Sequence, residues 1–163
     1  MLKNLLGHAI FFVVVFNLIS WIRESNLLEN NVETPAFELT SVDGRQVNSE
    51  DLKGKATLLY FWAPWCSVCH VSLPNLQGFY EENKADVNVV SVALSYEDIS
   101  EVHMSIVDHQ LQFTTLLGNM QIAEDFKISG FPTYYLLDED GKVVSKSLGY
   151  STQLGMELRA FIL

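Results

Sequence analysis

Cysteine is scarce in this chain of 163 residues. The two cysteines, Cys66 and Cys69, have only two residues between them. A disulfide that closes so short a loop removes little entropy from the unfolded chain, so a purely structural role explains the pair poorly.

Basic residues are scarce as well. There are 10 Lys and Arg residues against 20 Asp and Glu residues, for a formal net charge of -10. Nucleic acid and anionic lipid both require a positive field, so neither is an expected partner. Internal repeats and low-complexity tracts are also missing, and the length suits one domain of ordinary size.

An apolar run from Leu5 to Ile22 occupies the N-terminal part of the sequence. Its length is about the minimum for a helix that spans a bilayer. Three polar residues interrupt it, namely His8, Asn17 and Ser20, without forming the polar face of an amphipathic core helix. Bulky residues follow where a signal peptidase needs small ones. We therefore predict an uncleaved membrane anchor over residues 1–22, with a cleaved signal peptide and a core helix as the alternatives.

The charges around this run predict its orientation. Lys3 precedes the run, whereas Arg23 after it is offset at once by Glu24 and followed by further acidic residues. Positive charge tends to stay on the cytoplasmic side, which indicates an inward N-terminus and an external domain. Trp21 would then lie at the outer interface of the membrane.

The rest of the sequence alternates strand-like and helix-like segments. Residues 23–34 are polar and without periodicity, so we predict a linker there and a folded domain over residues 35–163. A β-hairpin is expected around Val42–Arg45. The later strand-like segments are residues 56–62, 87–94, 133–137 and 143–148, and the helix-like segments are residues 67–83, 99–109 and 122–126. This alternation, with an antiparallel hairpin at the end, predicts an α/β sandwich.

Apolar residues recur at helical spacing in the segment after the cysteines. They are Val71, Leu73, Leu76, Phe79 and Tyr80, and we expect them to form one apolar face. Pro74 should kink this helix. A last helix, capped by Ser151 or Thr152, carries Leu154, Leu158 and Phe161.

The run Cys66-Ser67-Val68-Cys69 lies where a buried strand is followed by a helix. Cysteines three apart in a first helical turn lie on one face, and unpaired backbone N–H groups point toward the first sulfur. The positive end of the helix favours the thiolate of Cys66, which is the form that attacks a disulfide. We expect Cys66 to be the nucleophile, and Cys69, deeper in the helix, to resolve the mixed disulfide.

The segment Trp62–Cys69, which reads WAPWCSVC, resembles the W-C-x-x-C segment of the thioredoxin superfamily. Pro74 matches the kinking proline of its active-site helix, and Gly130–Thr133 is similar to its cis-proline loop. The likeness runs from about Ala36 to the C-terminus. Together with the anchor and the hairpin, it looks most like the TlpA-like and ResA-like membrane-anchored oxidoreductases, closest to the suppressor-of-copper-sensitivity D type.

The resemblance implies a thioredoxin-like α/β/α sandwich with an added N-terminal β-hairpin, preceded by one transmembrane helix. It also implies a cis peptide bond before Pro132, with Trp65, Phe131 and Pro132 contacting an extended substrate strand. The expected partners are proteins with cysteines or disulfides, such as cytochrome apoproteins or copper-handling proteins, and a membrane electron donor. No bound cofactor is expected, and reduction is the favoured direction. The expected location is the cell inner membrane, with the catalytic domain in the periplasm.

Proton handling departs from the superfamily pattern. Thioredoxin has a buried carboxylate in the strand before its motif, and the matching residue here is Tyr60, which cannot act as a base near neutral pH. Cytochrome-maturation relatives place a Glu after the next strand, where the nearest residues are Tyr96 and Glu97. The proton acceptor for Cys69 is therefore unassigned. The residues expected to tune the redox potential are Ser67, Val68 and His70.

Two other functions use the same residues. Cys66–His70 has the C-x-x-C-H pattern of c-type haem attachment, with distal ligands to be sought among Met104, Met120, His103 and His109. A cytochrome needs neither the strand-to-helix context nor the Gly130–Thr133 loop. A copper or zinc site could use the cysteines with His70 and another histidine, but Cys69 and His70 project from a helix in different directions. We therefore expect no metal at the site.

Overall fold

A computed structural model describes residues 8, 11–12, 14–15 and 24–161 of the chain. The predicted anchor, residues 1–22, thus lies largely outside the described residues. Within the described ranges, no helix is both long enough and apolar enough to cross a membrane.

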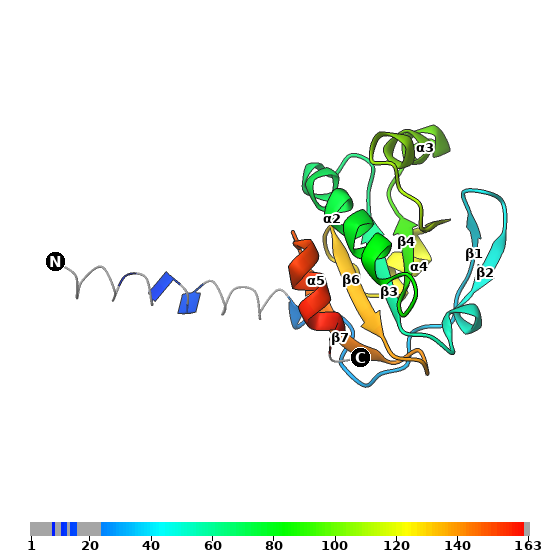
Figure 1. Cartoon of the computed structure of the whole chain (residues 1–163). Coiled ribbons are helices and arrows are strands. Elements are labelled where there is room, and N and C mark those ends of the chain that lie inside the picture. Colours follow the sequence, from blue (N-terminus) through cyan, green and yellow to red (C-terminus); the bar gives the residue numbers. More distant parts are fainter. Residues whose placement is uncertain (1–7, 9–10, 13, 16–23, 162–163) are drawn as a thin grey trace.

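The domain is a mixed seven-stranded β-sheet with helices on both faces (Figure 1). The strands are β1 (Glu38–Ser41), β2 (Gln46–Asn48), β3 (Thr57–Trp62), β4 (Asn88–Ala93), β5 (Thr114–Leu117), β6 (Thr133–Leu137) and β7 (Val143–Leu148). The helices are the 3-10 helix η1 (Ser49–Leu52) and the α-helices α2 (Ser67–Asn83), α3 (Ile99–Asp108), α4 (Met120–Asp125) and α5 (Gln153–Ala160). The predicted segments all correspond to elements of the same type, with ends that differ by a few residues.

The strand order is β2-β1-β5-β4-β3-β6-β7. β3 is parallel to β4 and β4 is parallel to β5, so each connection must cross over, which α2 and α3 do. Antiparallel hairpins close both ends of the sheet. The predicted N-terminal hairpin is confirmed, with Leu39 opposite Val47. This order places β3, the strand that leads to the cysteines, between β4 and β6.

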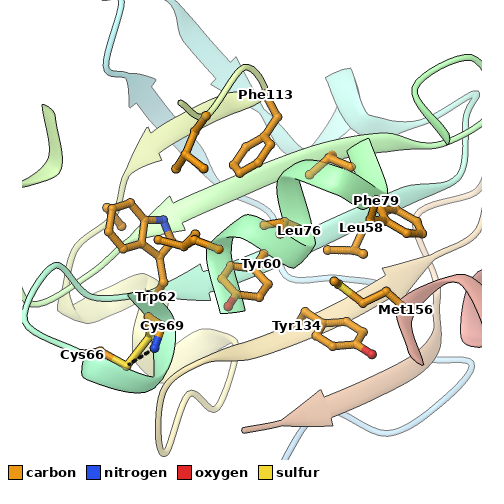
Figure 2. Close-up of a cluster of buried hydrophobic side chains, with 14 of the residues drawn as sticks. Leu58, Tyr60, Trp62, Cys66, Cys69, Leu76, Phe79, Phe113, Tyr134 and Met156 are labelled. Atoms are coloured by element: carbon orange, nitrogen blue, oxygen red, sulfur yellow. Dashed lines mark hydrogen bonds between the residues drawn. A yellow bond between two sulfur atoms is a disulfide. The ribbon is translucent and has the colours of Figure 1, made fainter. Parts of the chain in front are cut away.

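β3 is buried on both faces because its side chains alternate between two cores. Tyr60 and Trp62 join the core beneath α2 and α5, whereas Leu59 and Phe61 join the core on the opposite face, which also includes Ile122 of α4. Figure 2 shows the first core, with the two cysteines at its edge. A strand packed on both faces holds the loop that follows it in a fixed position.

Hydrophobicity alone does not identify which faces of α2 and α5 are buried. In α2, Leu73, Leu76 and Phe79 are buried as predicted, but Val71 is exposed. In α5, Met156 enters the core, while the apolar residues noted in the sequence are exposed: Leu154, Leu158 and Phe161. α5 lies beside α2 (Figure 1), and this packing selects the face of Met156. Isolated exposed apolar residues are common on protein surfaces.

The segment predicted as a linker is packed against the domain in its described part. Leu27 and Leu28 are buried in the core that contains Phe61. The backbone then follows β7, with the Asn31 N–H donating to the Val143 carbonyl at 2.7 Å and the Val143 N–H donating to the Val32 carbonyl at 2.9 Å. The packed domain therefore begins near Leu27 and not near Pro35. The sequence does not predict this boundary, because Leu27 and Leu28 are only two adjacent apolar residues and form no periodic pattern.

Candidate active site

The loop after β3 delivers Cys66 to the start of α2. Cys66 is the N-cap residue of α2, and its sulfur accepts a hydrogen bond from the Cys69 backbone N–H at 3.1 Å. The Cys66 N–H itself donates to the Ala63 carbonyl at 3.1 Å. The sulfur thus occupies the place of a capping oxygen, where free N–H groups and the helix dipole stabilise negative charge. A reduced Cys66 is therefore well placed to exist as a thiolate.

Cys66 and Cys69 form a disulfide, with their Cα atoms 5.2 Å apart. Cys66 keeps 6% of its surface exposed, and Cys69 keeps none. In Figure 2 the pair lies at the edge of the core that contains Trp62. Cys66 is therefore the sulfur that a second molecule can reach. Between the cysteines, Ser67 and Val68 are both exposed.

Trp65 lines the same groove as its neighbour Cys66 and is 64% exposed. Its indole N–H donates to the Ser95 carbonyl at 2.9 Å, and its ring packs edge-on against Phe131 with centroids 5.8 Å apart. Ser95 has a φ of 53°, which is uncommon for a residue other than glycine. Trp65 is therefore held by two loops that are distant in sequence. No local pattern marks Ser95 as part of the site.

The peptide bond between Phe131 and Pro132 is cis, as the resemblance implies. The loop around it is braced by two hydrogen bonds, from Thr133 Oγ1 to the Gly130 carbonyl at 2.8 Å and from the Gly149 N–H to the Pro132 carbonyl at 2.8 Å. Phe131 is half-buried and Pro132 is buried. The structure thus brings Phe131 into the same groove as Trp65 and Cys66, which lie more than sixty positions earlier in the sequence.

A groove of about 1160 Å³ extends from Cys66 and Trp65 across α4. It is lined by Asn26, Trp65, Cys66, Leu94, Ser95, Tyr96, Gly118, Asn119, Met120, Ala123, Glu124, Lys127, Ile128, Ser129, Gly130 and Phe131. Most of these residues are apolar or uncharged, with one acidic and one basic side chain. Asn26 lies in the segment that was predicted as a linker, so its place in the groove could not be foreseen.

Tyr60 and Glu97 are the residues that the sequence raises in connection with the proton acceptor for Cys69. Tyr60 is fully buried and stacks on Tyr134 with ring centroids 6.5 Å apart. Burial raises the pKa of the Tyr60 hydroxyl far above its ordinary value, so it remains protonated and neutral. Glu97 is exposed, and its backbone N–H bonds Glu101 at the start of α3. Glu97 is thus a solvated helix-start residue, and the acceptor for Cys69 stays unassigned.

His70 contacts the active-site loop and a second histidine. Its Nε2 lies 2.6 Å from the Pro64 carbonyl oxygen, and its Nδ1 lies 2.7 Å from His109 Nε2. Burial and the neighbouring His70 lower the pKa of His109, and Asp108 partly opposes them. His70 was expected to be near the cysteines from its sequence position, whereas its contact with His109 depends on the packing of α2 against α3.

The residues considered as haem or metal ligands do not gather at one site. The sulfurs are bonded to each other, His109 Nε2 is engaged by His70, and His103 Nδ1 bonds the Ile99 carbonyl at 3.0 Å. Met104 and Met120 point into solvent. In the part of the chain that the structure describes, no three or more His, Cys, Asp or Glu side chains gather as a metal site would require.

These observations define a class of protein. A buried strand, a C-x-x-C pair at the following helix N-terminus and a cis-proline loop that lines the same groove as Cys66 constitute a thioredoxin-like redox site. The chemistry that such a pair performs is the exchange of a dithiol for a disulfide. The chain is thus a thiol-disulfide oxidoreductase with a thioredoxin-like α/β fold.

Sequence comparison identifies the family. The sequence model of the AhpC/TSA family matches residues 31–146, and the chain belongs to this family. Thioredoxin-like protein YneN of Bacillus subtilis is 30% identical over 132 residues, covering 80% of this chain and 78% of its own. Thiol-disulfide oxidoreductase ResA of Bacillus cereus is 30% identical over 127 residues, covering 77% of this chain and 73% of its own. The expected resemblance to ResA-like proteins is thereby confirmed.

A solved structure agrees with this assignment. The thioredoxin domain of a thiol-disulfide oxidoreductase from Bacteroides vulgatus aligns with a TM-score of 0.74 at 26% sequence identity. The alignment covers 83% of this chain and 99% of that domain. The predicted thioredoxin-like fold is therefore confirmed for the described domain.

Proposed function

We propose that this protein is a membrane-tethered, extracytoplasmic oxidoreductase that exchanges the Cys66–Cys69 dithiol for disulfides of protein substrates, mainly as a reductase. The observation that carries the proposal is the difference between the two cysteines at the N-terminus of α2: Cys66 lines the groove and keeps some exposed surface, whereas Cys69 keeps none. Cys66 is thus the cysteine from which a client can be bound, with Cys69 behind it in the same small ring. This arrangement suits two successive exchange steps.

In the reducing direction, the Cys66 thiolate attacks one sulfur of a client disulfide. The client S–S bond breaks, its other sulfur leaves as a thiolate that takes up a proton, and a mixed disulfide forms. Cys69 then loses its proton and attacks the Cys66 sulfur, which forms the Cys66–Cys69 disulfide and releases the second client thiol. Two electrons thus pass to the client, and its two thiols take up the proton lost by Cys69 and one proton from solvent. A membrane electron donor is then needed to reduce the enzyme again.

The client is proposed to lie extended along Phe131 and Pro132, beside Trp65. This position is supported by the groove that Cys66 shares with Phe131 of the cis-proline loop and by the edge-on contact between Trp65 and Phe131. An extended segment bound here can pair with the loop backbone. The adjoining groove has room for side chains that flank the client cysteine.

The proposed location is the cell inner membrane, with residues 5–22 as a single N-in span and the domain in the periplasm. The apolar run and the charges on either side of it support this. Four residues, 23–26, separate the run from the buried Leu27, so such a tether would hold the domain close to the bilayer. The proposed clients are exported proteins with disulfides, including cytochrome apoproteins and copper-handling proteins.

The equilibrium reduction potential of the full chain in detergent, measured against glutathione or dithiothreitol, tests the direction. A value near that of thioredoxin, about -270 mV, supports a reductase. A value near -120 mV, typical of a strong oxidant, overturns the proposed direction. The absence of any Cys66–Cys69 couple would refute the exchange function itself.

Protease accessibility in spheroplasts tests the location. Added protease should degrade a C-terminal tag on the full chain while a cytoplasmic marker stays intact. Replacing the run 5–22 with a polar sequence should release the protein from the membrane fraction. Protection of the tag in intact spheroplasts would contradict the N-in orientation.

A further inference from the structure

His70 makes two hydrogen bonds to the loop that carries Cys66. The imidazole Nε2 lies 2.6 Å from the Pro64 carbonyl, and the backbone N–H donates to the Cys66 carbonyl at 3.1 Å. Pro64 and Cys66 flank Trp65, so His70 holds the chain on both sides of Trp65. On its other side, His70 meets His109 at the C-terminal end of α3.

The partners of His70 determine where its proton lies. A carbonyl oxygen only accepts hydrogen bonds, so His70 Nε2 must carry a hydrogen to bond Pro64. A neutral His70 then has a lone pair on Nδ1, and His109 Nε2, at 2.7 Å, must be the donor to it. Both imidazoles therefore carry their hydrogen on Nε2. His109 thus donates a hydrogen bond to His70, and His70 donates one to the Pro64 carbonyl of the loop.

This chain of bonds tolerates one added proton. A proton on His109 Nδ1 leaves every contact unchanged, whereas protonation of both rings places hydrogens on both facing nitrogens and two positive charges in contact. One added proton therefore leaves the pair bonded, and a second breaks the bond between the two rings.

The charged groups that act on His109 are His70 and Asp108, and burial together with His70 lowers the pKa of His109 despite Asp108. Its folded pKa thus lies below the unfolded value of about 6.5. The neutral pair is fully stabilising above that pH, and this contribution is lost as the pH falls through the folded pKa.

We propose that His109 is a positioning residue for the exchange reaction, acting through His70 to hold the Pro64–Cys66 loop in the geometry in which Cys66 attacks. The proposal rests on the proposed role of Cys66 as the nucleophile. His109 touches neither sulfur, and its effect is transmitted through one hydrogen bond to His70 and one from His70 to the loop. Double protonation of the pair breaks the first of these bonds and releases the loop.

Three variants of the full chain test the role of the donor at position 109. His109→Gln keeps an N–H donor but cannot titrate, and His109→Leu removes the donor. His103→Gln is the matched control, because His103 is an exposed histidine on the same helix that bonds only its own turn. The quantity measured is the rate constant of the reduced protein with a small disulfide from about pH 5 to 8. The rate is corrected for the thiolate fraction from absorbance at 240 nm.

At pH 7.5 we expect His109→Leu to lower the corrected rate constant about 3- to 10-fold, since small displacements of a reacting group are costly. His109→Gln and His103→Gln should stay within about twofold of wild type. The wild-type rate should fall further at the acid end of this range, where double protonation breaks the bond between the two rings, and this fall should be missing in His109→Gln but present in His103→Gln. Wild-type behaviour of His109→Leu, or a fall at the acid end in His109→Gln equal to that of wild type, would overturn the proposal.

A second measurement does not depend on the role of Cys66. Long-range 1H–15N spectra of the imidazole rings should show neutral His70 and His109 as Nε2–H tautomers. An Nδ1–H tautomer at either residue would overturn the proposed pair. If the NMR result holds but Cys66 proves inert, the function fails and the hydrogen-bonded pair stands.

Discussion

Cys66 and Cys69 share one disulfide but not one environment, since only Cys66 has exposed surface. In the proposed mechanism, replacing Cys69 by Ala leaves the attacking sulfur and removes the resolving one. We expect Cys69→Ala to accumulate mixed disulfides with client proteins, and Cys66→Ala to form none. Non-reducing gels with mass spectrometry of the trapped adducts measure this.

The control for this experiment is the double variant, which should form no adduct. Net turnover of a model protein disulfide should fall at least about 10³-fold in each single variant, because a dithiol is needed to complete the cycle. Adducts on Cys66→Ala instead of Cys69→Ala would show that the two roles are reversed.

Tyr134 and Tyr135 are adjacent buried residues of β6 with different hydrogen bonding. The Tyr135 hydroxyl donates to the Phe126 carbonyl at 2.7 Å and accepts from the Leu28 N–H at 3.3 Å. Burial raises the pKa of Tyr135 to about 12, so this donor stays protonated. The Tyr134 hydroxyl is buried and has no hydrogen-bond partner among the described residues.

We therefore expect Tyr135→Phe to lower the free energy of unfolding by about 1–3 kcal/mol, because two buried backbone groups lose their partner. Tyr134→Phe should change it by less than about 1 kcal/mol, since no bond is lost. Urea unfolding of the oxidised full chain measures both variants. Equal losses would mean that the Tyr134 hydroxyl has a partner, such as a buried water.

Among the elements, the segment before β1 differs most from the sequence-based expectation. Leu27 is 1% exposed, although it lies in a stretch that has the polarity of a linker. We expect Leu27→Ala to lower the free energy of unfolding by about 2–4 kcal/mol, as for other buried leucines. Urea unfolding of the full chain measures this.

Val32→Ala is the matched control for Leu27→Ala. Val32 lies in the same segment and is 42% exposed, and only its backbone carbonyl bonds β7. Its replacement should change stability by less than about 1 kcal/mol. A negligible effect of Leu27→Ala on the free energy of unfolding would instead support the prediction that this segment is a linker.

The elements themselves were largely predictable because their signals are local. β3 is a short apolar run with aromatic residues, and α2 follows it with apolar residues at helical spacing. The buried face of α5 was not predictable, because Leu154 and Leu158 are as apolar as a core residue and yet face solvent. The choice of face depends on the neighbouring α2, which lies about seventy residues earlier in the chain.

For the whole molecule, the net charge of -10 predicts how association responds to salt. Near the groove, Glu124 and Lys127 balance each other, so the field of the whole domain should dominate the approach of a client. We expect the rate constant for a cationic disulfide peptide to fall several-fold between about 0.01 and 0.5 M salt, as screening shortens the range of the field. Stopped-flow kinetics measure this.

A neutral peptide of the same length is the control and should show little salt dependence, while an anionic peptide should react faster as salt is added. Identical salt dependence for all three peptides would mean that the residues next to Cys66, and not the whole domain, control the encounter.

The sequence by itself determined the order of the elements, the C-x-x-C pair at a helix start and the class of chemistry. Each of these depends on residues within a few positions of one another, through side-chain periodicity, capping and the spacing of the cysteines. Only the tertiary structure decided what surrounds the pair. Trp65 contacts Ser95 and Phe131 because β3 pairs with both β4 and β6 in a fixed register. His70 contacts His109 because α3 packs beside α2. Such contacts join residues tens of positions apart, so no local pattern encodes them.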